Sequence, residues 1–223
     1  MDGYQVTALV PIKGASERVP GKNVRDFCGT PLMCRILETL DNTEYVSQII
    51  VDTDSELVAN LAATFHKVKI HERPKELVGH HVPMNEIIKH DLTILGQGHF
   101  FQTHVTNPLL TAKTISNAIE RYFTSLGQYD SLFSATVIQS RFFTHDLHPI
   151  NHDPAILLNT QDLQPVYEEN SCMYLFSHES FMKCRNRIGT RFQIYPMGKI
   201  ESLDIDTEED FQLAQSAWNA FRQ

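Results

Sequence analysis

QVTALVPI, residues 5–12, is followed directly by KGASERVPGKN, residues 13–23. The first run is apolar and rich in β-branched residues, which predicts a strand buried on both faces. An open parallel sheet presents its ligand crevice just beyond the carboxyl ends of such strands. We therefore expect residues 11–23 to form a binding loop at the edge of a sheet.

Short apolar runs alternate with longer segments of helical periodicity along the rest of the chain. This alternation indicates βαβ units around a mostly parallel sheet. The expected strands are residues 47–52, 67–71, 99–106, 131–137, 192–195 and 200–205, and the expected helices are residues 31–40, 55–65, 84–95, 112–126 and 207–221. In the last helix we expect a buried face formed by Phe211, Leu213, Ala214, Trp218 and Phe221. The predicted fold class is α/β, a Rossmann-like, mostly parallel sheet with helices on both faces.

The pattern changes after Ile138, where QSRFFTHDLHPINHDP (residues 139–154) is rich in His, Pro, Asn and Asp. We predict a small β-rich insertion at about residues 139–190. It lies within a single domain of residues 1–223, because no linker or internal repeat divides the chain.

Composition limits the classes of function. The 223 residues carry 19 Lys and Arg against 27 Asp and Glu, and the net charge of −8 argues against a broad nucleic-acid surface. No stretch approaches the ~18 uninterrupted apolar residues of a membrane span, and the first residues lack a basic region followed by a long apolar run. We expect a cytoplasmic protein with no membrane partner, in which the four irregularly spaced cysteines are reduced thiols.

The loop after the first strand has the composition of an anion site. Gly14 and Ser16 are small enough for backbone N–H groups to approach a phosphate, and Lys13, Arg18 and Lys22 supply positive charge. The sequence matches neither GxGxxG nor GxxxxGKS/T, which disfavours a dinucleotide site and a P-loop. The alternative is a solvated basic turn. We expect Lys22 to lie on the surface of this loop, so that its removal leaves the fold intact.

ESLDIDTEEDF, residues 201–211, is the second segment with a clear chemical character. Side chains two apart in a strand project to the same face, so Asp204 and Asp206 would form a carboxylate pair with Ile205 turned into the core. Two oxygen ligands suit Mg²⁺, which keeps several waters and binds substrate phosphates. The alternative is a helix N-terminus capped by Asp206 or Thr207, although this does not explain Asp204. A cationic loop and a carboxylate pair are together the minimum equipment for phosphoryl or nucleotidyl transfer.

Seven motifs occur in order along nearly the whole chain: PIKGASERVPGKN, DFCGTPL, IIVDTDSE, ERPKEL, VTNPLL, ENSCMYLF and ESLDIDTEEDF. In this order they resemble the CMP-sialic acid synthetase family, the acylneuraminate cytidylyltransferases, with the CMP-Kdo synthetases as more distant cousins. The resemblance implies a nucleotidyltransferase fold that uses CTP and Mg²⁺ to place CMP on a sugar acid and releases pyrophosphate. It also implies a homodimer in which the insertion reaches toward the partner subunit.

The resemblance assigns a nucleotide site to Gly14, Ser16, Lys22, Asn23 and Arg73. In this site Lys22 matches the lysine on the nucleotide phosphates, and Arg73 matches the arginine near the cytosine and ribose. Asp204 and Asp206 match the metal-binding pair. The residues on which we expect catalysis to depend are Lys13, Arg18, Lys22 and Asp206.

Departures from the family pattern concern mainly the acceptor. His104 stands where the family has a sugar-contacting glutamine, Leu110 replaces an arginine, and Glu168 and Glu169 precede Asn170 where sialate enzymes tend to carry a basic residue. We expect His104 to be a binding residue that faces the acceptor pocket, with a packed strand-end histidine as the alternative.

The loop departs as well, because Lys13 replaces an arginine and Glu17 a lysine, with Arg18 next door. Two alternatives therefore stay open. One is a cytidylyltransferase for Kdo or another acceptor, and the other is a non-catalytic nucleotide-binding relative.

Overall fold

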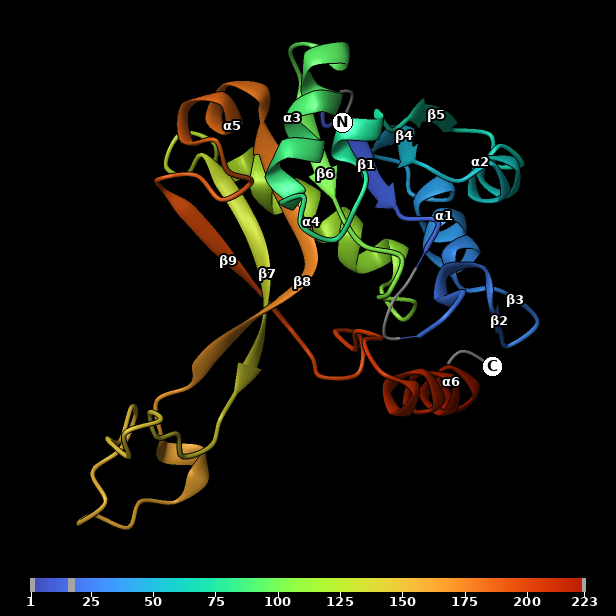
Figure 1. Cartoon of the computed structure of the whole chain (residues 1–223). Coiled ribbons are helices and arrows are strands. Elements are labelled where there is room, and N and C mark those ends of the chain that lie inside the picture. The colour runs from blue at the N-terminus through green and yellow to red at the C-terminus, as the bar shows by residue number, and fades with distance from the viewer. Residues whose placement is uncertain (1–2, 16–18, 222–223) are drawn as a thin grey trace.

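A seven-stranded sheet forms the centre of the molecule in the computed structural model, which describes residues 3–15 and 19–221 (Figure 1). Its strands are β1 (Val6–Ile12), β4 (Val46–Thr53), β5 (Val68–Glu72), β6 (His99–Gln102), β7 (Ser131–Ile138), β8 (Val166–Ser177) and β9 (Phe192–Met197), in the order β5-β4-β1-β6-β8-β7-β9. Strands β5, β4, β1 and β6 pair in parallel, as do β7 and β9, whereas β8 runs antiparallel to both of its neighbours. The predicted mostly parallel α/β sheet is confirmed.

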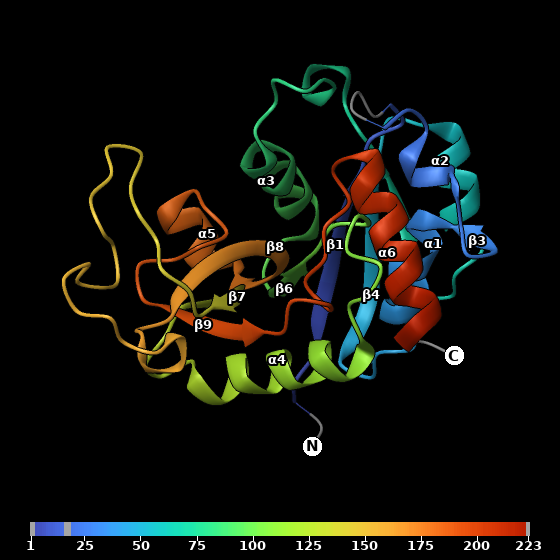
Figure 2. The same ribbon diagram turned by 90° about the horizontal axis from the view of Figure 1, so that it is seen from below.

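Helices cover both faces of the sheet (Figure 2). The α-helices are α1 (Leu32–Asp41), α2 (Glu56–Ala62), α3 (Met84–Leu95), α4 (Ala112–Ser125), α5 (His178–Cys184) and α6 (Glu208–Phe221). Short elements complete the fold: the 3-10 helices η1 (Lys22–Val24), η2 (Lys75–Leu77) and η3 (Thr160–Asp162), and the hairpin of β2 (Asp26–Phe27) and β3 (Thr30–Pro31). None of the helices in the described part of the chain is long and apolar enough to cross a membrane.

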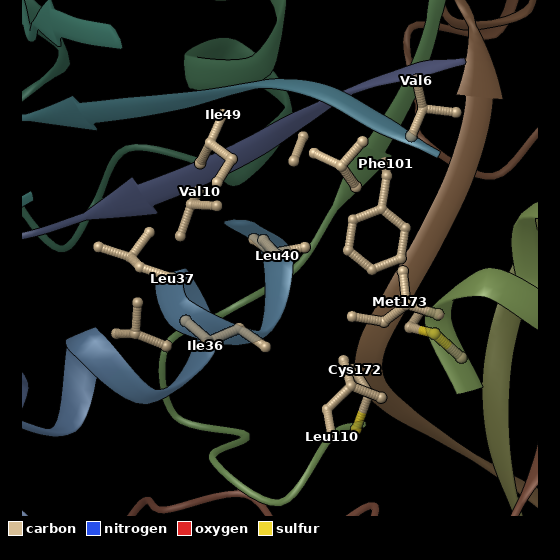
Figure 3. Packing of buried hydrophobic residues seen from close by; sticks show 14 of the residues in the cluster. Val6, Val10, Ile36, Leu37, Leu40, Ile49, Phe101, Leu110, Cys172 and Met173 are labelled. Atoms are coloured by element: carbon tan, nitrogen blue, oxygen red, sulfur yellow. The ribbon is translucent and has the colours of Figure 1, made fainter. Parts of the chain in front are cut away.

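Alternation along β1 divides the core into two layers. Val6, Ala8 and Val10 pack with α1, α2 and α4 on one face, where Figure 3 shows Val10 facing Leu37 of α1. Leu9 points to the other face and packs with α3 and α5. Side chains alternate in this way because the pleat has a period of two. Each fully buried aliphatic side chain contributes about 1.5–3 kcal/mol, so these two layers hold the helices firmly against both faces of the sheet.

Helix α6 packs outside this core and closes the end of the chain. Its Phe211 and Ala214 are fully buried against Phe27, Leu32 and Ile205. The expectation that Leu213 and Phe221 belong to this face is wrong, since their side chains are 54% and 65% exposed. Successive helical residues turn by about 100°, so Leu213 projects away from the face that holds Phe211. Phe221 is the last residue of α6, beyond the part of the helix that packs against the body.

Two strand predictions differ from the structure. Residues 200–205 form turns and coil, and β6 ends at Gln102 instead of continuing to residue 106. The backbone N–H of Thr103 still donates to the carbonyl of Leu9, and that of Ile205 to the carbonyl of Thr106. Single hydrogen bonds of this kind hold both segments against the sheet without extending it.

The expected insertion contains part of the sheet. Of residues 139–190, the range 166–177 forms β8 in the middle of the sheet, and 178–184 forms α5. Residues 139–165 project from the body as an extended arm between β7 and β8 (Figure 1). We call these residues the arm.

Candidate active site

Hydrogen bonds of its own polar groups fix the shape of the loop after β1. The Nδ2 atom of Asn23 donates to the carbonyl of Lys13 at 2.9 Å, which joins the two ends of the loop. Gly21 has the left-handed backbone torsion φ of 64° that favours glycine, and it turns the chain into η1. Lys22 and Asn23 are thereby directed inward, and both are buried.

Gly14 anchors the beginning of the loop. Its N–H donates to Oδ1 of Asp54 at 2.8 Å, so this group is engaged by the protein and is not aimed at a ligand. A Cβ atom at Gly14 would lie 2.7 Å from Cβ of Ser55, which explains the glycine by close approach. The two other predicted loop residues, Ser16 and Arg18, lie outside the described residues.

Lys22 connects this loop to the segment of residues 204–206. Only 8% of the residue is exposed, its Nζ donates to the carbonyl of Ile205, and it lies 3.9 Å from Oδ1 of Asp206. The prediction that Lys22 lies on the surface is therefore wrong. The side chain is a cross-link between the two predicted parts of the site.

The aspartate pair flanks a buried residue although its segment is not a strand. Ile205 is fully buried in the cluster with α6, while Asn107 donates to Oδ1 of Asp204 at 3.5 Å. Burial raises the pKa of Asp204 and the charge of Asp206 raises it further, against the opposing effect of Lys22. The cap of α6 is made by the Thr207 hydroxyl, which accepts from the N–H of Asp210 at 3.2 Å. The helix-cap alternative thus accounts for Thr207 and leaves Asp204 unexplained.

Arg73 reaches the site from the end of β5. It is buried, its Nε donates to Oδ1 of Asp52, and its Nη2 donates to the carbonyl of Asp52 at 3.0 Å. Asp52 lies at the end of β4 and is itself fully buried. Two contacts to one residue fix the plane of the guanidinium group.

Seven predicted residues from separate segments line one cavity of about 490 Å³: Lys13, Lys22, Asn23, Arg73, His104, Asp204 and Asp206. It lies at the carboxyl ends of β1, β5 and β6, where an open parallel sheet binds its ligands. A second cavity of about 410 Å³ shares Ser171, Asp204 and Asp206 with the first. Glu168, Glu169 and Lys199 are among its other walls. The aspartate pair therefore lies on the wall common to both cavities.

The donor set at this wall fits a hard divalent cation. It offers two carboxylates, one of them destabilised in its ionised form by burial and by its neighbour. The described residues hold no group of three or more His, Cys, Asp or Glu that could bind a metal. An ion at Asp204 and Asp206 would take its remaining ligands from water and from phosphate oxygens, which is the coordination typical of Mg²⁺.

Sequence reasoning missed three residues that position others. Asp52 ends the apolar run IIVD, and an acid at the carboxyl end of a strand is a signal that could have identified it. Gln102 lies in a segment that the sequence predicts as a strand, and no motif gives it a role. Arg187 lies in a segment with no motif, and its contacts with Gln102 and Tyr174 are visible only in the structure.

A cation-lined crevice at the carboxyl ends of parallel strands, with two aspartates on its wall, is an arrangement suited to nucleotidyl transfer. A family model described as "Cytidylyltransferase" matches residues 7–221 of the chain. The chain belongs to this cytidylyltransferase family, and the resemblance found in the sequence is confirmed at that level.

Known relatives extend over most of the chain. A pseudaminic acid cytidylyltransferase of Campylobacter jejuni subsp. jejuni serotype O:2 is 22% identical over 218 residues, which are 93% of this chain and 93% of that protein. An N-acylneuraminate cytidylyltransferase of Streptococcus agalactiae serotype V is 25% identical over 216 residues, 91% of this chain and 51% of the relative. A solved structure of a CMP:2-keto-3-deoxy-manno-octonic acid synthetase complexed with CTP shares the fold, with a TM-score of 0.69, 12% identity, and coverage of 97% of this chain and 99% of that one.

Proposed function

We propose that this chain is a Mg²⁺-dependent cytidylyltransferase that transfers CMP from CTP to a sialic-acid-like, nonulosonic sugar acid and releases pyrophosphate. The observation that carries the proposal is the single cavity that is lined both by Lys13, Lys22 and Arg73 and by Asp204 and Asp206. The names of the relatives above support CTP as the donor and a nonulosonic acid as the acceptor.

Each part of the cavity has a task in this reaction. Lys13 and Lys22, with Arg18 of the loop, neutralise the triphosphate, and Arg73 holds the cytosine and ribose. Asp204 and Asp206 hold Mg²⁺, which when bound withdraws charge from the phosphates. The acceptor hydroxyl in the second cavity gives up its proton to water and forms a bond to the α-phosphorus as the bond to the bridging oxygen breaks, and pyrophosphate leaves in line.

The second cavity supports an acceptor site beside the metal pair. Lys199 supplies a cation for an acceptor carboxylate, and Glu168 and Glu169 accept hydrogen bonds from hydroxyl or amide groups. This mixture favours a sugar acid with many hydroxyl groups. Kdo or another acceptor remains the alternative.

A panel of acceptors tests the proposal. Pyrophosphate release is measured with pseudaminic acid, N-acetylneuraminic acid and Kdo, each against CTP, ATP, GTP and UTP with Mg²⁺. We expect turnover with CTP and a nonulosonic acid, and loss of at least about 100-fold in Asp206→Asn. No turnover with any pair, together with unchanged CTP binding in Asp206→Asn, would identify a non-catalytic nucleotide-binding relative.

We further propose a homodimer formed through the arm. Leu147 and Leu157 in the arm are 79% and 91% exposed, and Ile150 and Ile156 are also more than half exposed. Apolar side chains gathered on one projection favour a protein partner. The cytoplasmic location stays a prediction from the sequence.

A further inference from the structure

His104 has hydrogen-bonding neighbours on one ring nitrogen. Its Nε2 lies 3.2 Å from Nε2 of Gln102 and 3.5 Å from Nη1 of Arg187. Gln102 is fully buried, with its Oε1 2.6 Å from Nη1 of Arg187 and its Nε2 3.0 Å from the carbonyl of Thr103. These contacts leave Nδ1 as the ring nitrogen that can meet a ligand in the cavity.

The chemistry of arginine fixes the direction of the hydrogen bonds that connect Arg187, Gln102 and His104. A guanidinium only donates, so Oε1 of Gln102 must accept from Arg187. The amide nitrogen of Gln102 then donates its two hydrogens, one to the carbonyl of Thr103 and one to Nε2 of His104. An imidazole nitrogen that accepts carries no proton, so the proton of His104 lies on Nδ1.

Arg187 is itself held in place. Its guanidinium stacks 3.6 Å from the ring centroid of Tyr174, and its Nη2 donates to the hydroxyl of Tyr174 at 3.1 Å. The same hydroxyl donates to Oε1 of Glu169. Glu169 lines the second cavity and His104 the first, so the network runs along the boundary between the proposed nucleotide and acceptor sites.

We propose that Arg187 and Gln102 are positioning residues that hold His104 as a neutral imidazole protonated on Nδ1. The two cavities share Ser171, Asp204 and Asp206, so an acceptor in the second cavity extends past this wall into the first. There His104 donates a hydrogen bond to a carbonyl or hydroxyl oxygen of the acceptor and does not bind it as a cation. The assignment of this partner to the acceptor rests on the proposed function.

The surrounding charges act in the same direction. Arg187 follows α5, Lys22 lies in η1 and Lys13 lies in the loop after β1, and all three are cations that oppose a second proton on His104. Burial together with these charges lowers the pKa of His104 to about 3. A histidine that stays neutral presents an N–H group to the ligand. It therefore selects a ligand with an acceptor oxygen at this position, because a buried N–H without an acceptor is unfavourable.

NMR of the protein labelled with ¹⁵N-histidine tests the tautomer without any substrate. The two-bond correlations of His104 should show a proton on Nδ1 and no titration between pH 5 and pH 8. In Gln102→Glu the carboxylate still accepts from Arg187 but cannot donate to His104, so the proton should move to Nε2. If that variant does not fold, Arg187→Met frees the Gln102 amide to rotate, and a population with the proton on Nε2 should appear. A wild-type His104 that titrates in this range, or carries its proton on Nε2, overturns the inference.

Kinetics tests the consequence for the acceptor that turns over in the panel. Gln102→Glu should raise the KM for the acceptor at least tenfold and leave the KM for CTP within twofold. His104→Asn, whose amide nitrogen lies near the position of Nδ1, should raise the acceptor KM less than His104→Leu does. Equal effects of the two His104 variants contradict the inference. The absence of any turnover in the wild type contradicts the proposed function instead, and leaves the NMR result standing.

Discussion

Lys22 links nucleotide binding to the stability of the fold. Its Nζ donates to the carbonyl of Ile205 and lies close to Asp206, so the cation that would meet the phosphates also fixes the segment that would hold the metal. Lys13 lines the same cavity but is exposed. The two lysines therefore differ in what their removal changes.

We expect Lys22→Met to lower kcat/KM for CTP by about 100-fold or more, because it removes a charge aimed at the phosphates. It should also lower the free energy of unfolding by about 1–3 kcal/mol, since the buried carbonyl of Ile205 loses its donor. Lys13→Met is the matched control and should weaken CTP binding with a change in stability within about 0.5 kcal/mol. Steady-state kinetics and urea unfolding measure both. Equal stability of the two variants would contradict the cross-link.

Asp52, which binds Arg73, also interacts with the carboxylate of Asp91. Both aspartates are fully buried, and Oδ2 of each has no hydrogen-bond partner. Burial raises the pKa of Asp52 and the charge of Asp91 raises it further, with Arg73 opposing. The folded chain therefore binds a proton at Asp52 more readily than the unfolded chain. This contribution to stability is present below the unfolded pKa of about 3.9 and is lost as the pH rises through the folded pKa.

Asp91→Asn should reduce that loss, because it removes a charge that repels the ionised Asp52. Relative to the wild type, the free energy of unfolding of the variant should rise between pH 4 and pH 7, by about 1.4 kcal/mol for each unit by which the pKa of Asp52 falls. Urea unfolding at several pH values measures the difference. Asp91→Asn also removes the contact of Oδ1 of Asp91 with Nδ1 of His71 at 2.8 Å. In an Asp52→Asn background the same substitution should therefore keep only the pH dependence that this contact causes, and identical profiles in both backgrounds would refute the coupling.

How far single residues can be predicted depends on whether their partners are near in sequence. Lys13 and Lys22 could be predicted because they follow the apolar first strand, and Asp204 because it alternates with Asp206 around an apolar residue. The burial of Lys22 could not, since its acceptor lies 183 residues away at Ile205. Arg187 is the extreme case, because its partners at Gln102 and Tyr174 belong to strands that neighbour each other only in the sheet.

At the scale of elements, the segment of residues 200–206 shows how both aspartates come to line the cavities although the predicted strand is absent. An extended coil alternates its side chains much as a strand does, so Ile205 turns inward and Asp204 and Asp206 line the cavities without ladder hydrogen bonds. Hydrophobic alternation predicts which side chains are buried. It does not predict whether a neighbouring strand is available to pair with.

Glu201 anchors this segment to the first turn of α4. Its Oε1 accepts from the N–H and hydroxyl of Thr111 at 2.8 and 2.6 Å, and its Oε2 accepts from the hydroxyl of Thr114 at 2.9 Å. A carboxylate at a helix N-terminus is also favoured by the helix dipole. The anchor lies three residues before Asp204.

Glu201→Ala should lower the free energy of unfolding by about 1–2 kcal/mol and raise the Mg²⁺ concentration needed for half-maximal activity, because Asp204 and Asp206 lose their support. Ser177→Ala is the matched control. The Ser177 hydroxyl caps α5 by accepting from the N–H of Ser180 at 3.0 Å, far from both aspartates in the sheet. It should lower stability by about 1 kcal/mol without changing the Mg²⁺ requirement. A shift of that requirement in both variants would mean that general loosening, and not the anchor, affects the metal pair.

At the scale of the whole molecule, the parallel order of β5, β4, β1 and β6 brings the ends of four strands to one edge. Residues as distant as Lys13 and Asp206 meet there, which the alternation of strands and helices predicts once the sheet is taken as parallel. The antiparallel β8 is what the pattern did not predict, because its residues 166–177 follow the polar arm and so were assigned to the insertion. The arm, residues 139–165, is the part of the described chain that leaves this framework, and it tests the proposed homodimer.

A dimer held by the arm should depend on its exposed leucines. Sedimentation velocity of the wild type should show a dimer at micromolar concentration, and Leu147→Glu and Leu157→Glu should each raise the dissociation constant about tenfold or more, as expected for an apolar side chain lost from an interface. Leu213→Glu on α6 is the matched control, because Leu213 is 54% exposed on a helix outside the arm and its substitution should leave the dimer unchanged. A monomeric wild type at all concentrations, or equal weakening by Leu213→Glu, would show that the arm is not the interface. Since the arm emerges between β7 and β8, whose Glu168 and Glu169 line the second cavity, a loss of the dimer that also raises the KM for the acceptor would mean that the partner subunit completes the acceptor site.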